Sequence, residues 1–213
     1  MRSTRIVAAA TAAIVASALS AAPAAAHGKG KPLGTRSLAA VLTADKSGFD
    51  RNGHDFDILT AAVNAVLKAK PASPVGVLAD GSTALTAFIP NDRAFRTLVA
   101  DLQHTKRLPG EKQAFTAVAG LGIDTVESVL LYHVVPGATV NRKAALKADG
   151  AKLKTATGAS VKVDVYGRYW KRIKLIDADR NDRDPRVIKF DVNKGNRQIA
   201  HGIDRVLRPI DLP

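Results

Sequence analysis

Histidines are the side chains of this sequence that could act as general bases or metal ligands near neutral pH. The chain has five of them, far apart in the sequence: His27, His54, His104, His133 and His201. No two are spaced i, i+2 or i, i+4, the spacings that place two imidazoles on one face of a strand or a helix. His133 or His201 with a nearby Asp could still belong to a hydrolase or a metal-dependent enzyme. Such an enzyme is the alternative to a binding function.

The common catalytic motifs are absent from the sequence. It contains no Gly-x-Ser-x-Gly, no His-Glu-x-x-His, no phosphate loop with Gly-Lys-Ser/Thr and no Gly-x-Gly-x-x-Gly. The chain has no cysteine, which excludes disulfides, cysteine-ligated zinc or iron–sulfur centres and thiol catalysis. We therefore predict no catalytic residue, no metal and no cofactor.

The acidic stretch 177–184 begins like a calcium-binding loop. An EF-hand loop needs Gly at its sixth position and Glu at its twelfth, whereas this chain has Asp182 and Ile188 there. Arg180 and Arg183 lie inside the stretch and offset its negative charge. We therefore interpret it as a solvated turn with Asp–Arg pairs.

The segment 168–174 combines basic and aromatic residues. The candidate contact residues for an anionic polymer are Arg168, Trp170, Arg172 and Lys174. On a strand, Trp170, Arg172 and Lys174 share one face. Nucleic acid could bind such a face by stacking and charge, but for an exported protein we expect an anionic glycan or cell-wall polymer and no nucleic acid. The alternative is that these Lys and Arg side chains only provide solubility.

The N-terminus has the three parts of a secretory signal peptide. Met1–Arg5 carries two positive charges, Ile6–Leu19 is apolar, and Ala24–Ala26 supplies small side chains. We predict that residues 1–26 are a signal peptide and that 27–36 is a flexible leader rich in Gly and Lys. With a formal net charge of +13, the protein is expected to be secreted, retained by charge at a cell wall, and without a transmembrane segment after cleavage.

The remaining residues, 37–213, are predicted to form a single α+β domain. Helical spacing of apolar residues dominates its first part and alternation its second, which favours packed N-terminal helices and a mostly antiparallel sheet. The predicted helices are 38–42, 57–67, 92–102, 111–119, 124–133 and 139–148. The predicted strands are 83–89, 151–157, 160–166, 170–176, 187–192 and 197–199.

Three segments resemble the signatures of the fasciclin domain family. Thr86–Phe95 has an apolar strand, a Pro, a polar cap and a Phe-bearing helix. Leu130–Gly137 contains a Tyr-His pair before Pro-Gly, and Asn196–Pro209 resembles the closing signature. The segments occur in the family's order, and Phe56–Leu59 fits the start of the domain.

The resemblance implies a fasciclin-like β-wedge with packed helices and a secreted, non-enzymatic adhesion module of a bacterial type. Its expected partner is an extracellular protein or an anionic polymer; a purely structural protein is a further possibility. The candidate interaction or motif residues are Tyr132, His133, His201, Asp204 and Arg205. Tyr132 and His133 are expected to stabilise a helix–strand junction by hydrogen bonds to the backbone. We expect Asp204 and Arg205 to form a local cap or ion pair.

Two segments are the hypothesised contact regions, Tyr132–Gly137 and Ile199–Leu207. The residues expected to frame the core are Thr86, Phe88, Phe95, Val206 and Leu207. The basic strand is a separate candidate surface.

Overall fold

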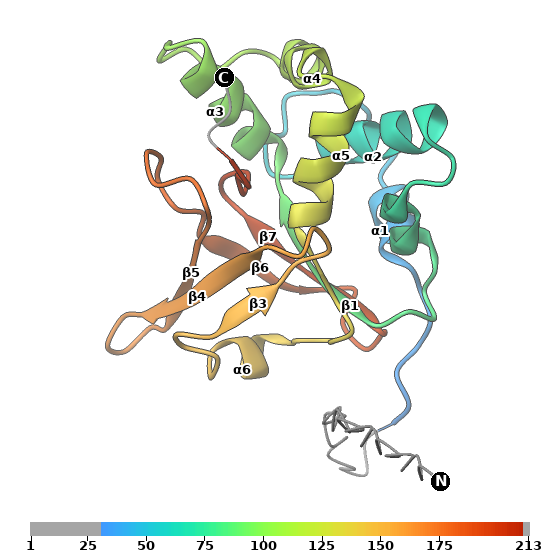
Figure 1. Cartoon of the computed structure of the whole chain (residues 1–213), viewed down its shortest axis with the longest axis vertical. Coiled ribbons are helices and arrows are strands. Elements are labelled where there is room, and N and C mark those ends of the chain that lie inside the picture. The colour runs from blue at the N-terminus through green and yellow to red at the C-terminus, as the bar shows by residue number, and fades with distance from the viewer. Residues whose placement is uncertain (1–30, 211–213) are drawn as a thin grey trace, which may run out of the picture. The chain divides into compact units, whose positions relative to one another are not determined.

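The computed structural model describes residues 31–210, and the chain forms one compact unit from Leu33 onward. The predicted signal peptide, 1–26, and residues 27–30 of the predicted leader lie outside the described residues. Within the described part, no single helix is long and apolar enough to span a membrane. Helices α2 to α5 pack at one side of a four-stranded sheet, and a three-stranded sheet lies at its other side (Figure 1).

The six predicted helices occur in the predicted order, and a 3₁₀ helix that was not predicted lies after the second of them. They are α1 (Leu38–Leu42), α2 (Asp57–Ala69), a 3₁₀ helix (Pro74–Ala79), α3 (Asp92–Leu102), α4 (Glu111–Gly120), α5 (Ile123–Tyr132) and α6 (Arg142–Ala145). The predicted cap of α3 is confirmed: Asn91 Oδ1 accepts a hydrogen bond of 2.9 Å from the N–H of Ala94.

One helix is much shorter than expected. The stretch 139–148 contains only α6, because the chain on both sides of this helix bonds to strands. On one side, the N–H of Val140 donates to Thr86 Oγ1 at 2.9 Å. On the other, the N–H of Gly150 donates to the carbonyl of Val163 at 2.9 Å. These bonds leave one helical turn between the two attachments.

The strands form two sheets. The first has the order β2 (Val134–Pro136), β1 (Leu85–Pro90), β7 (Gln198–Ile203) and β6 (Val187–Val192), and the second the order β3 (Lys152–Lys154), β4 (Ser160–Tyr166) and β5 (Arg172–Ile176). All strand pairs are antiparallel except β1 with β7, which are parallel from the pair Leu85–Gln198 to the pair Pro90–Ile203. The prediction of an α+β fold with mostly antiparallel sheets is confirmed. Strand β2 was not predicted.

Strand β1 is buried along its whole length because both faces of its sheet are covered. Leu85, Ala87 and Ile89 belong to the apolar cluster under the helices, while Phe88 belongs to the cluster between the two sheets. The residues expected to frame the core are all confirmed as buried: Thr86, Phe88, Phe95, Val206 and Leu207.

Gly34, in the predicted leader, is hydrogen-bonded to the segment before β7. The N–H of Gly34 donates to the carbonyl of Gly195 at 2.8 Å, and the N–H of Arg197 donates to the carbonyl of Gly34 at 2.9 Å. A Cβ at Gly34 would lie 2.4 Å from Asn196 Oδ1, so a larger residue here would displace the side chain of Asn196. The end of the predicted leader is thus bonded to the chain just before β7.

Candidate functional site

His133 joins the end of α5 to the segment after β7. Its Nδ1 lies 2.7 Å from the carbonyl of Val129, and its Nε2 lies 2.9 Å from the N–H of Leu207. Because Nε2 must accept from Leu207, Nδ1 carries the proton and donates to Val129, and the ring is neutral. Burial lowers the pKa of His133 to about 4.

Tyr132 joins the same end of α5 to the three-stranded sheet. Its side chain is fully buried, and its hydroxyl donates to the carbonyl of Ser160 at 3.2 Å. Burial, with a smaller contribution from the charge of Asp177, raises the pKa of Tyr132 to about 12. Tyr132 and His133 therefore contact the protein interior and not the surface.

His201, on β7, also has both ring nitrogens in contact with backbone groups. Its Nε2 lies 2.8 Å from the carbonyl of Val140, and the N–H of Asp191 donates to its Nδ1 at 3.3 Å. The ring packs against Phe88 and Phe190, with centroid distances of 6.1 and 5.5 Å. Burial lowers the pKa of His201, which keeps the ring neutral.

The enzyme alternative requires His133 or His201 to act as a base or as a metal ligand. In each ring both nitrogens contact backbone groups, so neither ring could accept a substrate proton or bind a metal without breaking a buried hydrogen bond. A cavity of about 200 Å³ lies beside His201, and its lining is almost entirely apolar. The geometry gives these two histidines structural roles.

Asp204 and Arg205, which were expected to form a local cap or ion pair, both have partners elsewhere in the sequence. Asp204 Oδ1 accepts from the N–H of Arg186 at 2.7 Å, whereas Arg205 Nη1 donates to Asp101 Oδ2 of α3 at 3.0 Å. The chain turns directly after β7, and the two neighbouring side chains therefore reach different elements. Arg205 attaches this turn to the helical layer.

The acidic stretch 177–184 is held by an arginine that the sequence analysis did not consider. The side chain of Arg208 is 8% exposed, and its guanidinium contacts Asp182 and lies 3.4 Å from Asp179 Oδ2. The backbone N–H of Arg208 donates to Asp177 Oδ2 at 2.9 Å. The prediction that arginines inside the stretch pair with its acids is therefore wrong, since the partner comes from the end of the chain.

The outward face of the three-stranded sheet is strongly basic. We call the outward residues Lys152, Lys154, Lys162, Arg172 and Lys174 the basic face. The basic face arises because side chains alternate between the two faces of the sheet along each strand. The residues between its members, such as Val161 and Ile173, are buried against the other sheet. Lys152 and Lys162 are direct cross-strand neighbours. Two like charges in this position destabilise a sheet.

Acidic groups neutralise only one member of the basic face. Lys174 Nζ lies 3.2 Å from Asp184 Oδ2 and 3.3 Å from Asp164 Oδ2, and these carboxylates, Asp184 first, raise the pKa of Lys174. Among the described residues, the other four members have no ion pair. The unpaired positive charge therefore lies on β3, β4 and the start of β5.

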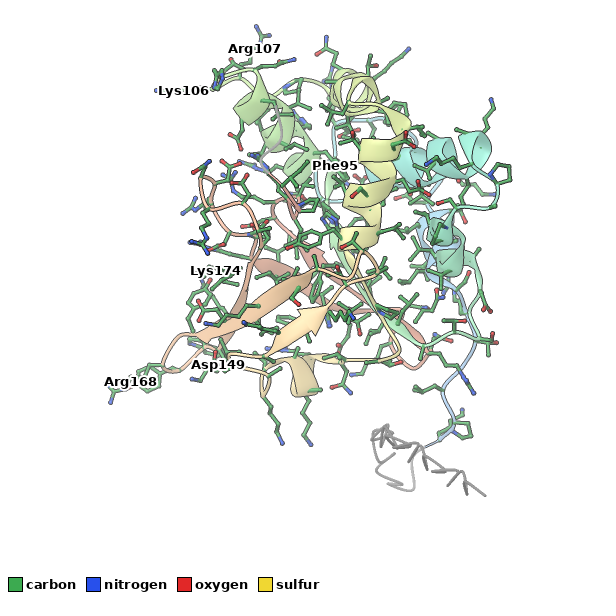
Figure 2. All side chains as sticks on the ribbon, in the orientation of Figure 1. Phe95, Lys106, Arg107, Asp149, Arg168 and Lys174 are labelled. Atoms are coloured by element: carbon green, nitrogen blue, oxygen red, sulfur yellow. The ribbon has the colours of Figure 1, made fainter. Side chains whose placement is uncertain are left out.

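The turn between β4 and β5 carries two exposed aromatic rings. Tyr169 is 82% and Trp170 85% exposed, and the Arg168 guanidinium lies 5.5 Å from the centre of the Tyr169 ring. Figure 2 shows Arg168 projecting beyond the sheet, with Lys174 on the sheet itself. Since β5 begins at Arg172, the prediction that Trp170 shares its strand face is wrong, and the ring lies in the turn. We call the segment 168–171 the aromatic turn.

The predicted basic surface contained residues of β5 and the turn before it, but none from β3 or β4. Lys152, Lys154 and Lys162 alternate with apolar residues in segments that were correctly predicted as strands. The alternation showed that each lysine faces outward, but strand order and register were needed to place the lysines beside one another.

A family model described as Fasciclin domain matches residues 57–209 of the chain. Among solved structures, 13 chains match. One is a FAS1 domain pair from the insect cell adhesion molecule fasciclin I, with a TM-score of 0.55 and 17% sequence identity over 82% of this chain and 51% of that chain. The chain thus spans about half the length of that structure, and at this identity the likeness shows the fold alone. No curated protein matches the chain.

Proposed function

The chain belongs to the fasciclin domain family, and on that premise we propose that it is a secreted adhesion module that binds an anionic extracellular polymer through its basic face. The proposal includes a non-enzymatic role. The adhesion context comes from the family and from the name of the insect cell adhesion molecule whose structure is similar. The choice of ligand comes from the side chains of this chain.

The observation that carries the proposal is the unpaired pair Lys152 and Lys162. Their side chains are neighbours on adjacent strands, exposed and without an acidic partner among the described residues. Such a pair is unfavourable in the free protein because the two charges repel each other. An anion that contacts both lysines removes this repulsion. The relief of the repulsion then contributes to the free energy of binding.

The spacing of the basic face suits a polymer better than a single small anion. Neighbouring strands lie about 4.8 Å apart, and residues two apart on a strand lie about 7 Å apart. Lys152, Lys154 and Lys162 therefore form a small two-dimensional array of charges. A chain that carries a carboxylate or sulfate on each repeating unit can contact several of them at once. The aromatic turn adds exposed ring surface beside the array.

A binding experiment with matched variants tests the proposal. The probes are polygalacturonate and dextran sulfate, with neutral dextran as the reference. We expect Lys152→Ser with Lys162→Ser to weaken polyanion binding about tenfold at low salt and to reduce its salt dependence. The control is Lys106→Ser with Arg107→Ser, which removes the same charge from the exposed loop after α3 (Figure 2). It should change the affinity less than about threefold.

The single tryptophan of the chain is Trp170, so its fluorescence reports directly on the aromatic turn. Polyanion binding at the basic face should protect Trp170 from quenching by iodide. Equal losses of affinity in the two double variants would show that only net charge matters and would contradict the proposal. So would the absence of polyanion binding at low salt.

A further inference from the structure

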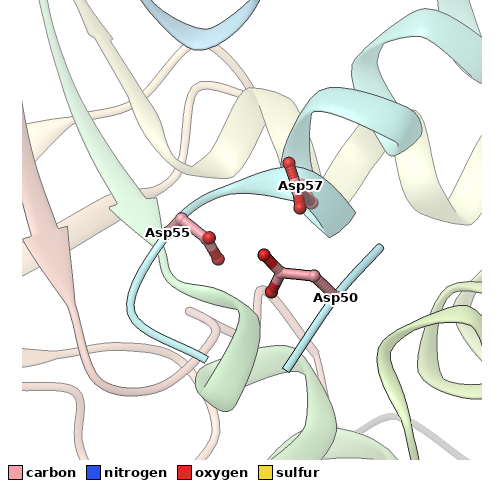
Figure 3. A group of neighbouring side chains, drawn as sticks. All are labelled: Asp50, Asp55 and Asp57. Atoms are coloured by element: carbon pink, nitrogen blue, oxygen red, sulfur yellow. The ribbon is translucent and has the colours of Figure 1, made fainter. Parts of the chain in front are cut away.

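Five carboxylates gather where three helices begin. Asp57, Asp92 and Glu111 are the first residues of α2, α3 and α4, and Asp50 and Asp55 lie in the loop before α2. We call these five residues the acidic cluster. Figure 3 shows the carboxylates of Asp50, Asp55 and Asp57 directed toward one another. The oxygens of these three lie within 4.8 Å of one another, as do those of Asp55, Asp92 and Glu111.

Backbone donors account for part of this negative charge. Asp92 accepts from the N–H groups of Asp57 and Ile58 at 3.1 and 2.8 Å, and Glu111 Oε2 accepts from the N–H of Asp50 at 2.6 Å. The positive ends of the helix dipoles also favour acids at these positions. These contacts fix the carboxylates in place.

Other oxygens of the cluster are buried without any partner. Asp55 Oδ1, Asp57 Oδ2 and Glu111 Oε1 have no hydrogen-bond donor. Glu111 is only 2% exposed, so its free oxygen has no access to bulk water. A buried carboxylate oxygen without a donor is strongly unfavourable. The cluster therefore lacks a positive partner at a defined place, between Asp55 and Glu111.

No basic side chain neutralises the cluster. The Nε of Arg96 donates to the carbonyl of Pro109 at 2.7 Å. Among the described residues, none of the five carboxylates forms an ion pair with a Lys, Arg or His side chain.

A cation from solvent can reach the cluster. Asp57 lines an open groove of about 300 Å³ together with Asp45, Lys46, Gly48 and Phe49. The groove thus brings solvent to Asp57, at one edge of the acidic cluster.

We propose that the acidic cluster is a Ca²⁺ site in which Asp55, Asp92 and Glu111 are the main ligands, and Asp50 and Asp57, on the other side of Asp55, add negative charge. All donors are carboxylate oxygens, which select hard cations over zinc or copper. Several carboxylates at irregular positions suit the flexible six- to eight-fold coordination of Ca²⁺ better than the strict octahedron of Mg²⁺. Binding joins the loop before α2 to α3 and α4.

Calorimetry and thermal unfolding of the purified protein test the site. After treatment with EDTA, titration with CaCl₂ should show one Ca²⁺ per chain with a Kd on the order of 10⁻⁴–10⁻³ M, as for extracellular calcium modules. The midpoint of thermal unfolding should rise with CaCl₂ and less with MgCl₂.

Glu111→Gln distinguishes a cation site from a purely structural cluster. The amide keeps an oxygen for the N–H of Asp50 but removes a buried charge, so this variant should bind Ca²⁺ at least about tenfold more weakly. In EDTA it should unfold at a higher temperature than the wild type, because repulsion is relieved. Asp57→Asn should behave in the same way.

Asp124→Asn is the control, since Asp124 is an exposed acid in the first turn of α5, and this variant should bind Ca²⁺ like the wild type. The proposal is overturned if 10 mM CaCl₂ neither gives binding heat nor shifts the unfolding midpoint. It is equally overturned if Glu111→Gln and Asp57→Asn retain the wild-type affinity.

Discussion

His133 illustrates how a polar side chain can stabilise the interior of this protein. A neutral imidazole provides one donor and one acceptor, and the two backbone groups beside the ring need those two functions. Protonation would turn the acceptor into a second donor facing the N–H of Leu207. Burial and this geometry therefore both favour the neutral ring. The two hydrogen bonds of His133 can form together only while the ring is neutral, so they depend on pH.

Folding stability should consequently depend on pH through His133. The unfolded chain binds a proton at His133 below about pH 6.5, whereas the folded chain does so only near the folded pKa of about 4. The contribution of His133 is thus fully present above pH 6.5 and is lost as the pH falls toward 4, by about 3 kcal/mol in total. Urea unfolding at a series of pH values measures this loss.

A variant separates His133 from other groups that titrate in the same range. Burial raises the pKa of Asp92 to about 8, so Asp92 acts in the opposite direction and favours the folded state as the pH falls from 8 to 4. His133→Gln removes only the histidine contribution. We expect the acid loss of stability to be smaller in His133→Gln than in the wild type; an unchanged pH profile would refute the assignment.

At the level of elements, two chain segments pack very closely just before β1. The turn before β1 passes so close to the N-terminal segment that a Cβ at Gly81 would lie 1.7 Å from the carbonyl oxygen of Thr35. That oxygen belongs to the backbone and cannot rotate away. Glycine is required here for close packing of two chain segments, and not for an unusual backbone angle.

Substitution of this glycine should destabilise the protein, and a second glycine provides the control. Gly81→Ala forces the segment around Thr35 away and should lower the free energy of unfolding by about 1–3 kcal/mol or more. Gly120→Ala, at the end of α4, meets no atom within 4 Å and should be neutral or stabilising by up to about 1 kcal/mol. Chemical denaturation of both variants checks the difference. Similar values for the two would contradict the structural argument.

At the level of the whole molecule, the segment before α1 meets the segment before β7. The segment 33–36 bonds to residues 195–197, and the side chain of Gln198 accepts from the N–H of Leu38 at 2.7 Å. The parallel pairing of β1 with β7 also joins the first strand of the domain to its last. The sheet therefore forms only when distant parts of the sequence come together.

Removal of residues 33–36 should destabilise the folded protein, because these residues bond to the segment before β7. A chain that begins at residue 37 lacks the hydrogen bonds of Gly34 and Arg36 to residues 195–197. We expect it to unfold about 1–3 kcal/mol more easily than a chain that begins at residue 33. Equal stability in urea unfolding would mean that the body begins at residue 37, as the sequence analysis expected.

The sequence by itself determined the local elements. Strands β4 and β6 match their predicted bounds, and the start of α3 was predicted from Asn91, because side-chain periodicity and capping act over a few neighbouring residues. The series of motifs also indicated the family. For the same local reason, the outward direction of Arg172 and Lys174 could be predicted.

Only the tertiary structure decided which distant side chains meet. The register of β3 with β4 places Lys152 beside Lys162, and the meeting of three helix starts brings Glu111 to Asp55. Both juxtapositions depend on strand order and helix packing, which arise from burial of the whole core and leave no local pattern in the sequence. Periodicity shows which way a side chain points, and only packing shows what lies opposite it.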